Sequence, residues 1–187
     1  MRKLNLQVQI TVDGYIAGLN GEMDWLIFDW DNELKHYVRE ITEQVDCIVL
    51  GRKLAQGFIP HWAAIPKGED AWSIDKMKNT KKVVFTKTLE KSEWENTVLA
   101  KGELVDEITK LKKQEGKDII AYGGASFVSA LIKEGLIDEF HLFINPTAIG
   151  KGLSIFNKLE VNQNLILIKS TSFDCGIVVL RYEPKNK

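Results

Sequence analysis

The stretch from Lys117 to Phe156, KDIIAYGGASFVSALIKEGLIDEFHLFINPTAIGKGLSIF, decides how this chain folds. It opens with a short apolar run of strand type, Asp118–Tyr122, which ends in the glycine pair Gly123-Gly124. A helical pattern follows, with apolar residues spaced by three and four positions at Val128, Leu131 and Ile132. Residues 139–144 then predict a second strand. Strand, helix and strand in this order predict two parallel strands joined by a helical crossover.

The glycine pair lies where a strand turns directly into a helix. The first N–H groups of a helix have no acceptor within the helix, and they carry the positive end of its dipole. Such a turn suits a phosphate group, although Gly-Gly is a weaker signal than a full G-x-G-x-x-G motif. The alternative is that the two glycines only let the strand and the helix pack closely.

Composition limits the class of protein. A chain of 187 residues that is 44% hydrophobic and 27% charged predicts one soluble domain, 1–187, with a core that needs neither disulfides nor metal. A net charge of −1 argues against nucleic-acid binding. No apolar run approaches the ~20 residues of a membrane span, and the first residues lack the apolar region of a signal peptide, so a cytoplasmic location is expected. No His or Cys has a partner at metal-ligand spacing, so no metal site is predicted.

The remaining elements alternate between strand and helix patterns. Leu4–Val12 alternates apolar and polar residues, which predicts a half-buried strand. Phe58–Lys78 contains two prolines and is predicted as a long loop or short helices. Leu165–Ser172 and Gly176–Tyr182 predict an antiparallel hairpin at the end of the chain. The expected fold is a three-layer α/β/α domain with a mainly parallel sheet and antiparallel C-terminal strands.

Two further strand ends carry groups that could hold an anion. Gly51-Arg52-Lys53 follows the strand Cys47–Leu50, and Thr86-Lys87-Thr88 follows the strand Lys82–Phe85. Ligands of open α/β sheets gather at the carboxyl ends of the strands, which favours a role in binding. The alternatives are solvated surface charge for Arg52 and Lys53 and ordinary turn residues for the second group.

Three carboxylates lie within or directly beside the tryptophan-containing segment Trp25–Trp30, namely Asp24, Asp29 and Asp31. A carboxylate desolvated by a tryptophan would have a raised pKa and could orient or protonate a substrate. Aspartate is also favoured at helix N-termini for capping alone, and a helix is predicted to begin near Asp29 or Asp31. Both interpretations stay open for each residue.

Several motifs together resemble the dihydrofolate-reductase-like superfamily, and most of all the branch that contains the riboflavin-biosynthesis reductase, or RibD C-terminal domain. The resemblance spans essentially the whole chain. Its motifs are a Gly-Gly helix start, a Gly-Leu-Ile-Asp-Glu turn, a Pro…Gly-x-Gly…Phe segment, an Asp-Gly loop after the first strand and a Gly-Arg pair after the second. In the same order, these five motifs lie at Ala121–Ala125, Gly135–Glu139, Pro146–Phe156, Thr11–Ala17 and Leu50–Arg52.

The resemblance implies an NADPH-dependent reductase that transfers hydride to a C=N or C=O carbon of a small pteridine- or pyrimidine-type substrate. Similar enzymes are 5-amino-6-(5-phosphoribosylamino)uracil reductase and dihydrofolate reductase. It also implies a homodimer, with the apolar C-terminal strands as a candidate interface. By position in the motifs, the pyrophosphate of the cofactor would be held by Gly123, Gly124, Ala125 and Ser126, with further phosphate contacts from Gly51, Arg52 and Lys53. Thr86 and Lys87 would lie near the adenosine ribose and its 2′-phosphate. Ile16 and Ala17 would lie against the nicotinamide.

Two departures from the family pattern concern the substrate. Tyr15 stands where riboflavin-pathway reductases commonly have a basic residue, and Leu26-Ile27-Phe28 stands where they have a small polar pair. A more apolar pocket would suit a phosphoribosyl group less well. The alternatives to a reductase are an NADP(H)-binding protein without catalysis, for example a sensor, and a nucleoside or phosphosugar enzyme on another α/β fold.

Overall fold

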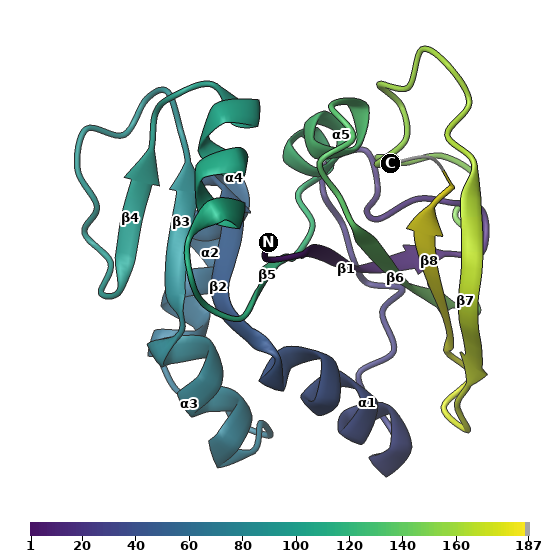
Figure 1. The fold of residues 1–187 in the computed structure, drawn as a ribbon. Helices are drawn as coiled ribbons and strands as arrows, with labels where there is room; N and C mark the ends of the chain where they lie inside the picture. Colours follow the sequence, from purple (N-terminus) through teal and green to yellow (C-terminus); the bar gives the residue numbers. More distant parts are fainter. Residues whose placement is uncertain (186–187) are drawn as a thin grey trace.

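The computed structural model describes residues 1–185, so the last two residues of the predicted domain lie outside it. Eight strands form one sheet in the order β4-β3-β2-β5-β1-β6-β8-β7 (Figure 1). The strands are β1 Leu4–Thr11, β2 Val45–Gly51, β3 Lys81–Phe85, β4 Thr97–Ala100, β5 Asp118–Ala121, β6 Glu139–Asn145, β7 Leu165–Ser172 and β8 Val178–Pro184. The helices are α1 Asn32–Glu43, α2 Arg52–Ala63, α3 Ala71–Asn79, α4 Leu104–Lys113 and α5 Ala125–Lys133.

The sheet is parallel except at its C-terminal side. β1 lies in the middle and pairs in parallel with both β5 and β6. β8 runs antiparallel to β6 on one side and to β7 on the other. The predicted mainly parallel sheet and the predicted C-terminal hairpin are therefore confirmed.

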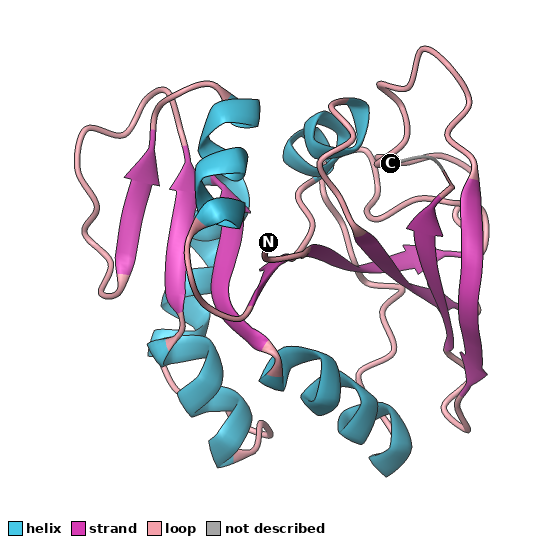
Figure 2. Ribbon diagram, in the orientation of Figure 1, coloured by secondary structure: helices cyan, strands magenta, loops and turns pink. Residues whose placement is uncertain are grey.

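Helices cover both faces of the sheet (Figure 2). On the face that we call the α5 face, the even-numbered apolar residues of β1 share one core cluster with residues of α4 and α5. On the opposite face, which we call the α1 face, α2 and α3 pack with β2 and β3, and α1 packs near β6 and β8. The predicted three-layer arrangement follows from these two sets of contacts.

β1 corrects one prediction, because it is not a half-buried strand. Asn5 and Gln7 point to the α1 face and are only 7% and 8% exposed. The alternation of apolar and polar residues thus does not separate core from solvent. It separates an apolar face from a buried polar one, and a sequence pattern cannot distinguish these two cases.

The segment predicted as irregular from Phe58 onward is also corrected. α2 continues through Pro60 to Ala63, and α3 begins after Asp70. A proline inside a helix removes one backbone hydrogen bond. Burial of Ala55 and Ile59 against the sheet offsets that loss. The Asp70 Oδ1 atom caps α3 by accepting hydrogen bonds from the N–H groups of Trp72 and Ser73, each at 3.0 Å.

Candidate functional site

The helices differ in whether a side chain accepts hydrogen bonds from the first backbone N–H groups at their N-termini. α1 and α3 start in connecting segments, and each is capped by an aspartate side chain. α2, α4 and α5 start at or just after the C-terminal end of a parallel strand, and none of them has a side-chain cap. Their first N–H groups therefore remain available at one edge of the sheet, which is where an anionic ligand would be held.

The N-termini of α2 and α5 lie next to each other at this edge. A Cβ atom on Gly51, at the end of β2, would lie 2.8 Å from the Cβ of Phe127 in α5. A Cβ atom on Gly124, at the start of α5, would lie 3.7 Å from the Cβ of Leu54 in α2. Two uncapped helix dipoles thus converge, and Gly51 is explained by close packing.

The glycine pair has a different explanation. Gly123 and Gly124 have φ angles of +79° and +82°, which other residues rarely adopt. Added Cβ atoms would meet only ordinary van der Waals contacts, at 3.8 Å from Val8 for Gly123. The alternative that the pair serves close packing is therefore wrong. The conformation requires glycine, and it leads straight into α5, where the N–H groups of Ala125 and Ser126 have no acceptor within the helix.

Arg52 and Lys53 occupy the first turn of α2 beside these N–H groups. Lys53 is exposed, and the Arg52 Nη1 atom lies 3.3 Å from Oε1 of Gln56 on the helix surface. Neither cation is held by a carboxylate among the described residues, so both charges are available at the helix N-terminus.

Thr86 and Lys87 are more constrained than predicted. The Thr86 hydroxyl accepts hydrogen bonds from the N–H groups of Thr88 and Leu89, each at 3.1 Å, and so stabilises its own turn. The Lys87 ammonium lies 3.0 Å from Oε1 of Glu103 and donates to two carbonyl groups of the β4–α4 connection. A phosphate at this place would compete with Glu103 for Lys87.

The loop after β1 is joined to the segment after β6. The Asp13 carboxylate accepts from the N–H groups of Ile149, at 3.1 Å, and Gly150, at 2.7 Å. The Thr11 hydroxyl, and then these backbone donors, hold the pKa of Asp13 below its usual value. Sequence analysis did not single out Asp13, although both joined segments belong to motifs of the resemblance.

Ile16 and Ala17 lie at this junction. Both are buried. The N–H of Ile16 donates to the carbonyl oxygen of Leu153 at 2.9 Å, and the N–H of Leu153 donates to the carbonyl oxygen of Ala17 at 2.8 Å. A Cβ atom on Gly152 would overlap the carbonyl oxygen of Ala17. The second glycine of Gly-x-Gly is thus needed for the two segments to meet, and the pair of segments holds Ile16 and Ala17 in place.

The three candidate carboxylates separate in the structure. Asp31 caps α1, since its Oδ1 accepts from Leu34 N at 2.8 Å and its Oδ2 from Cys175 N at 3.0 Å. These backbone hydrogen bonds lower the pKa of Asp31, so the predicted raised pKa is wrong for this residue. Asp24 and Asp29 are exposed on the segment that leads to α1. Burial by a tryptophan does not occur for either of them.

Asn145, at the end of β6, anchors that segment. It is completely buried, and its Oδ1 accepts from the N–H of Ile27 at 3.2 Å while its Nδ2 donates to Gln9 at 2.7 Å. Trp30 stacks on Phe143 with ring centroids 6.5 Å apart. Sequence analysis did not predict this role for Asn145.

A buried ionic network lies on the α1 face beside β1. The Tyr37 hydroxyl is 2.7 Å from Nδ1 of His141, and Nε2 of His141 is 2.7 Å from Glu139. Arg181 Nη2 donates to the same carboxylate at 2.8 Å. Burial alone would raise the pKa of Glu139, but the hydrogen bonds from His141 and Arg181 outweigh it and lower the pKa to about 2. Glu139 therefore stays ionised at neutral pH.

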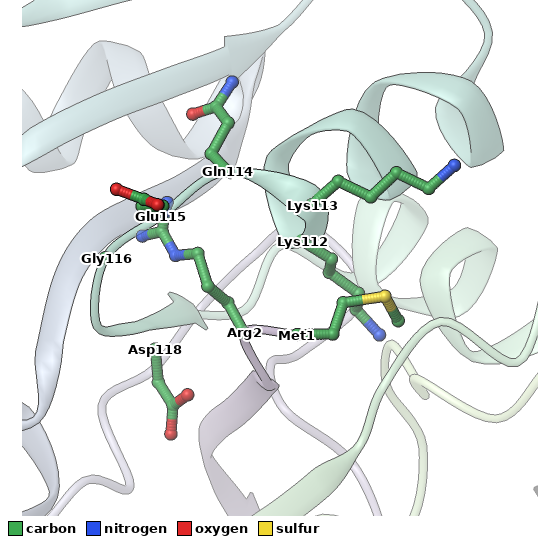
Figure 3. A pocket seen from close by; sticks show the side chains of 8 residues that line it. All are labelled: Met1, Arg2, Lys112, Lys113, Gln114, Glu115, Gly116 and Asp118. Carbon is green, nitrogen blue, oxygen red and sulfur yellow. The ribbon is translucent and has the colours of Figure 1, made fainter.

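A pocket at the opposite edge of the sheet does not resemble a cofactor site. Figure 3 shows Arg2, Lys112 and Asp118 among the side chains that line it, near the first residues of β1 and β5. Its buried cations form ion pairs within the fold, Arg2 with Asp46 of β2 and Lys112 of α4 with Asp138, which precedes β6. Within residues 1–185, no cluster of His, Cys, Asp and Glu could ligate a metal, and no helix there is long and apolar enough to cross a membrane.

Comparisons with known proteins agree with this geometry. Residues 2–179 match the RibD C-terminal domain family. The YyaP protein of Bacillus subtilis, which is uncharacterised, is 36% identical over an alignment of 188 positions that covers 97% of this chain and 94% of that protein. The riboflavin biosynthesis protein RibD of Aquifex aeolicus is 26% identical over an alignment of 168 positions that covers 78% of this chain and 46% of that protein.

A solved structure shows the same fold. It is that of a diaminohydroxyphosphoribosylaminopyrimidine deaminase/5-amino-6-(5-phosphoribosylamino)uracil reductase from Thermotoga maritima. The TM-score is 0.70 at 18% identity, and the match covers 98% of this chain and 56% of that one. The predicted family resemblance is confirmed, and the chain belongs to the RibD C-terminal domain family.

Proposed function

We propose that the chain is an NADPH-dependent reductase that transfers hydride to a C=N or C=O carbon of a small pteridine- or pyrimidine-type substrate. The observation that carries the proposal is the convergence of two uncapped helix N-termini, those of α2 and α5, at the C-terminal edge of the sheet. Membership of the RibD C-terminal domain family supports it, because the Thermotoga maritima neighbour is described as a reductase.

The residues at this edge fit a dinucleotide. The backbone at Gly123, Gly124, Ala125 and Ser126 would hold the pyrophosphate, and Gly51 with Arg52 and Lys53 would add further donors and charge. The side chains of Ile16 and Ala17, held by the joined segments, would support the nicotinamide. The bound cofactor would supply the hydride, and the protein would supply position and exclude water.

The 2′-phosphate would be recognised by Lys87 in exchange for its contact with Glu103. This exchange predicts how two substitutions should change the preference for NADPH over NADH. Lys87→Ala would lower the preference for NADPH over NADH by about tenfold, and Glu103→Gln would leave it equal or stronger, since one charge-assisted contact contributes roughly 1.5 kcal/mol.

A proton source would come from the segment before α1. Asp31 is a positioning residue, because both of its oxygens accept backbone hydrogen bonds and it stays ionised. Asp24 and Asp29 are the remaining candidates. If Asp24→Asn and Asp29→Asn both leave turnover unchanged, neither carboxylate takes part.

The decisive experiment is cofactor binding measured by nicotinamide fluorescence. We expect NADPH to bind with micromolar affinity or better and NADH more weakly. Absence of NADPH binding below about 1 mM would reject the reductase. The alternative of an NADP(H)-binding protein without catalysis predicts binding with no oxidation of the cofactor by any pteridine or pyrimidine, and the exposure of Asp24 and Asp29 is the observation in its favour.

Gly124→Ala tests the phosphate contact directly, with Gly135→Ala as its control. Both glycines have positive φ angles, +82° and +61°, at opposite ends of α5. Gly135→Ala should cost about 1–2 kcal/mol, and Gly124→Ala should cost more, because its ψ of 95° lies outside the left-handed region that alanine can enter. Only Gly124→Ala should weaken NADPH binding, by tenfold or more. Equal NADPH affinity in the two variants would show that the glycine pair serves the fold alone.

A further inference from the structure

The loop after Ala17 contains the only asparagine of the chain that is followed by glycine, Asn20 before Gly21. Both residues are exposed, and neither has a place in the proposed reductase. The side-chain amide of an asparagine can be attacked by the backbone nitrogen of the next residue. Glycine hinders this attack least, because it has no Cβ atom. The local sequence is therefore the one in this chain most prone to deamidation.

Two backbone hydrogen bonds close this loop. The N–H of Gly21 donates to the carbonyl oxygen of Gly18 at 3.1 Å, and the N–H of Gly18 donates to the carbonyl oxygen of Glu22 at 2.8 Å. The nitrogen of Gly21 that would attack Asn20 is thus engaged as a donor in the closed loop. It becomes free only when the turn opens, so the reaction depends on local opening of residues 18–22.

The Glu22 carboxylate holds the side chain that would be attacked. Its Oε1 accepts from Nδ2 of Asn20 at 2.6 Å, and its Oε2 accepts from the backbone N–H of Asn20 at 3.0 Å. A Cβ atom on Gly18 would overlap Oε2, so the carboxylate lies directly over the turn. The hydrogen bond from the Asn20 side chain is the main cause that lowers the pKa of Glu22, so this acceptor stays ionised at neutral pH.

We propose that Asn20 is a site of spontaneous deamidation that the Glu22 carboxylate restrains, and that conversion of Asn20 opens the loop. In the reaction, the nitrogen of Gly21 forms a bond to Cγ of Asn20, and the bond from Cγ to Nδ2 breaks. The side-chain nitrogen leaves as ammonia with the proton from the Gly21 nitrogen, and a cyclic imide remains. Water then adds to either carbonyl group of the imide and leaves aspartate or isoaspartate. Water is the only co-reactant.

The product disrupts the contact with Glu22 for an electrostatic reason. A carboxylate oxygen would replace the Nδ2 donor of Asn20, which lies 2.6 Å from an oxygen of Glu22. Two ionised carboxylates repel each other strongly at that distance, and opening of the loop separates them. Isoaspartate also lengthens the backbone between Asn20 and Gly21, so the turn that Gly21 closes with Gly18 loses its geometry.

The test is peptide mapping by mass spectrometry of the full chain kept in mildly alkaline buffer. Asn162 is the internal control, because it is also exposed but precedes glutamine. In the original protein, Asn20 should convert to aspartate and isoaspartate faster than Asn162 converts. Glu22→Ala should accelerate conversion of Asn20 about tenfold, the factor that one charge-assisted hydrogen bond controls, and should leave Asn162 unchanged.

Glu22→Gln should give a rate between those of the original protein and Glu22→Ala, because it keeps an amide oxygen as an acceptor without the charge. Glu22 is exposed, so neither substitution should change the melting temperature. Conversion of Asn20 no faster than that of Asn162 in the original protein would overturn the proposed site. Conversion in Glu22→Ala no faster than in the original protein would overturn the restraint by Glu22.

Opening of the loop is measured by hydrogen exchange in the peptide that contains residues 18–22. Asn20→Asp carries the charge of the product and should exchange faster than Asn20→Ala, which loses the side-chain hydrogen bond without adding a charge. Equal exchange in these two variants would contradict the opening by repulsion. None of these measurements involves a cofactor, so their failure would leave the reductase proposal untouched.

Discussion

Single glycines in this chain are required for three different physical reasons. Gly51 lies against Phe127, so any side chain there would collide. Gly123 and Gly124 have space for a Cβ but adopt φ angles that favour glycine. Gly152 has an ordinary φ angle but lies against the backbone of Ala17. A sequence shows four glycines, and only the structure distinguishes these roles.

Gly152→Ala should destabilise the junction between the Asp-Gly loop and the segment after β6. The new Cβ would overlap Ala17 O and lie 3.0 Å from the Cβ of Tyr15, so the backbone must move, at a cost of about 1–3 kcal/mol. Urea unfolding measures the loss. Gly150→Ala is the control, because a Cβ there meets nothing within 4 Å and only its φ of +74° is strained. A larger loss for Gly150→Ala would contradict the close-approach argument.

Glu139 should make stability fall at acidic pH. Its folded-state pKa of about 2 lies below the ordinary value of 4.5, so its contribution is fully present above pH 4.5 and is lost as pH falls toward 2. A difference of this size corresponds to roughly 3 kcal/mol. Denaturation at a series of pH values should show this slope in the original protein and a flatter one in Glu139→Gln. Glu160→Gln, at an exposed glutamate paired with Lys133, should leave the slope nearly unchanged.

Among the elements, β7 stands out because it is an edge strand with apolar residues toward solvent. Ile166, Leu167 and Ile168 are 46%, 52% and 44% exposed, and only one side of the strand is paired, with β8. Proteins usually protect such edges with charge, proline or a partner. We propose that a second copy of this chain covers β7, as an isologous homodimer in which the two β7 strands face each other.

Leu167→Lys should convert the dimer to a monomer, because two buried ammonium groups would face each other across the two-fold axis. Sedimentation at about 10 μM should show the change, with far-UV circular dichroism unchanged. Val161→Lys, in the exposed segment before β7, is the control and should leave the dimer intact. A monomeric original protein, or a dimer that survives Leu167→Lys, would reject this interface.

At the scale of the whole molecule, the candidate cofactor edge is assembled from connections that lie far apart in the sequence. Asp13 holds Gly150, and Gly51 lies against Phe127. A ligand that bridges these connections binds the folded chain alone and should stabilise it.

NADPH at 100 times its dissociation constant should add about 2.7 kcal/mol to the free energy of unfolding. For a chain of this size that corresponds to a rise of roughly 5–10 °C in melting temperature. NADH at the same concentration should give a smaller rise, and Gly124→Ala should give little rise with NADPH. An equal rise with both cofactors would mean that no group at this edge recognises the 2′-phosphate.

The sequence alone determined the strands, most helices, the class of fold and the family. These follow from local periodicity, glycine turns and motif spacing, which are properties of neighbouring residues. It also identified the glycine pair and the Gly-Arg-Lys strand end. It offered capping of α1 by Asp31 as one of two interpretations, and the structure decides for capping. It did not predict that Lys87 pairs with Glu103 or that Asp13 holds a segment 137 residues away.

Only the tertiary structure decided what the polar residues of β1 do. Their alternation predicted a strand with one face in water, and the sheet order placed that strand at the centre with both faces covered. Periodicity records which residues share a face, but the order of strands in the sheet decides what lies against that face. Asn5 and Gln7 are buried for that reason, and the same local pattern on an edge strand would have left them in solvent.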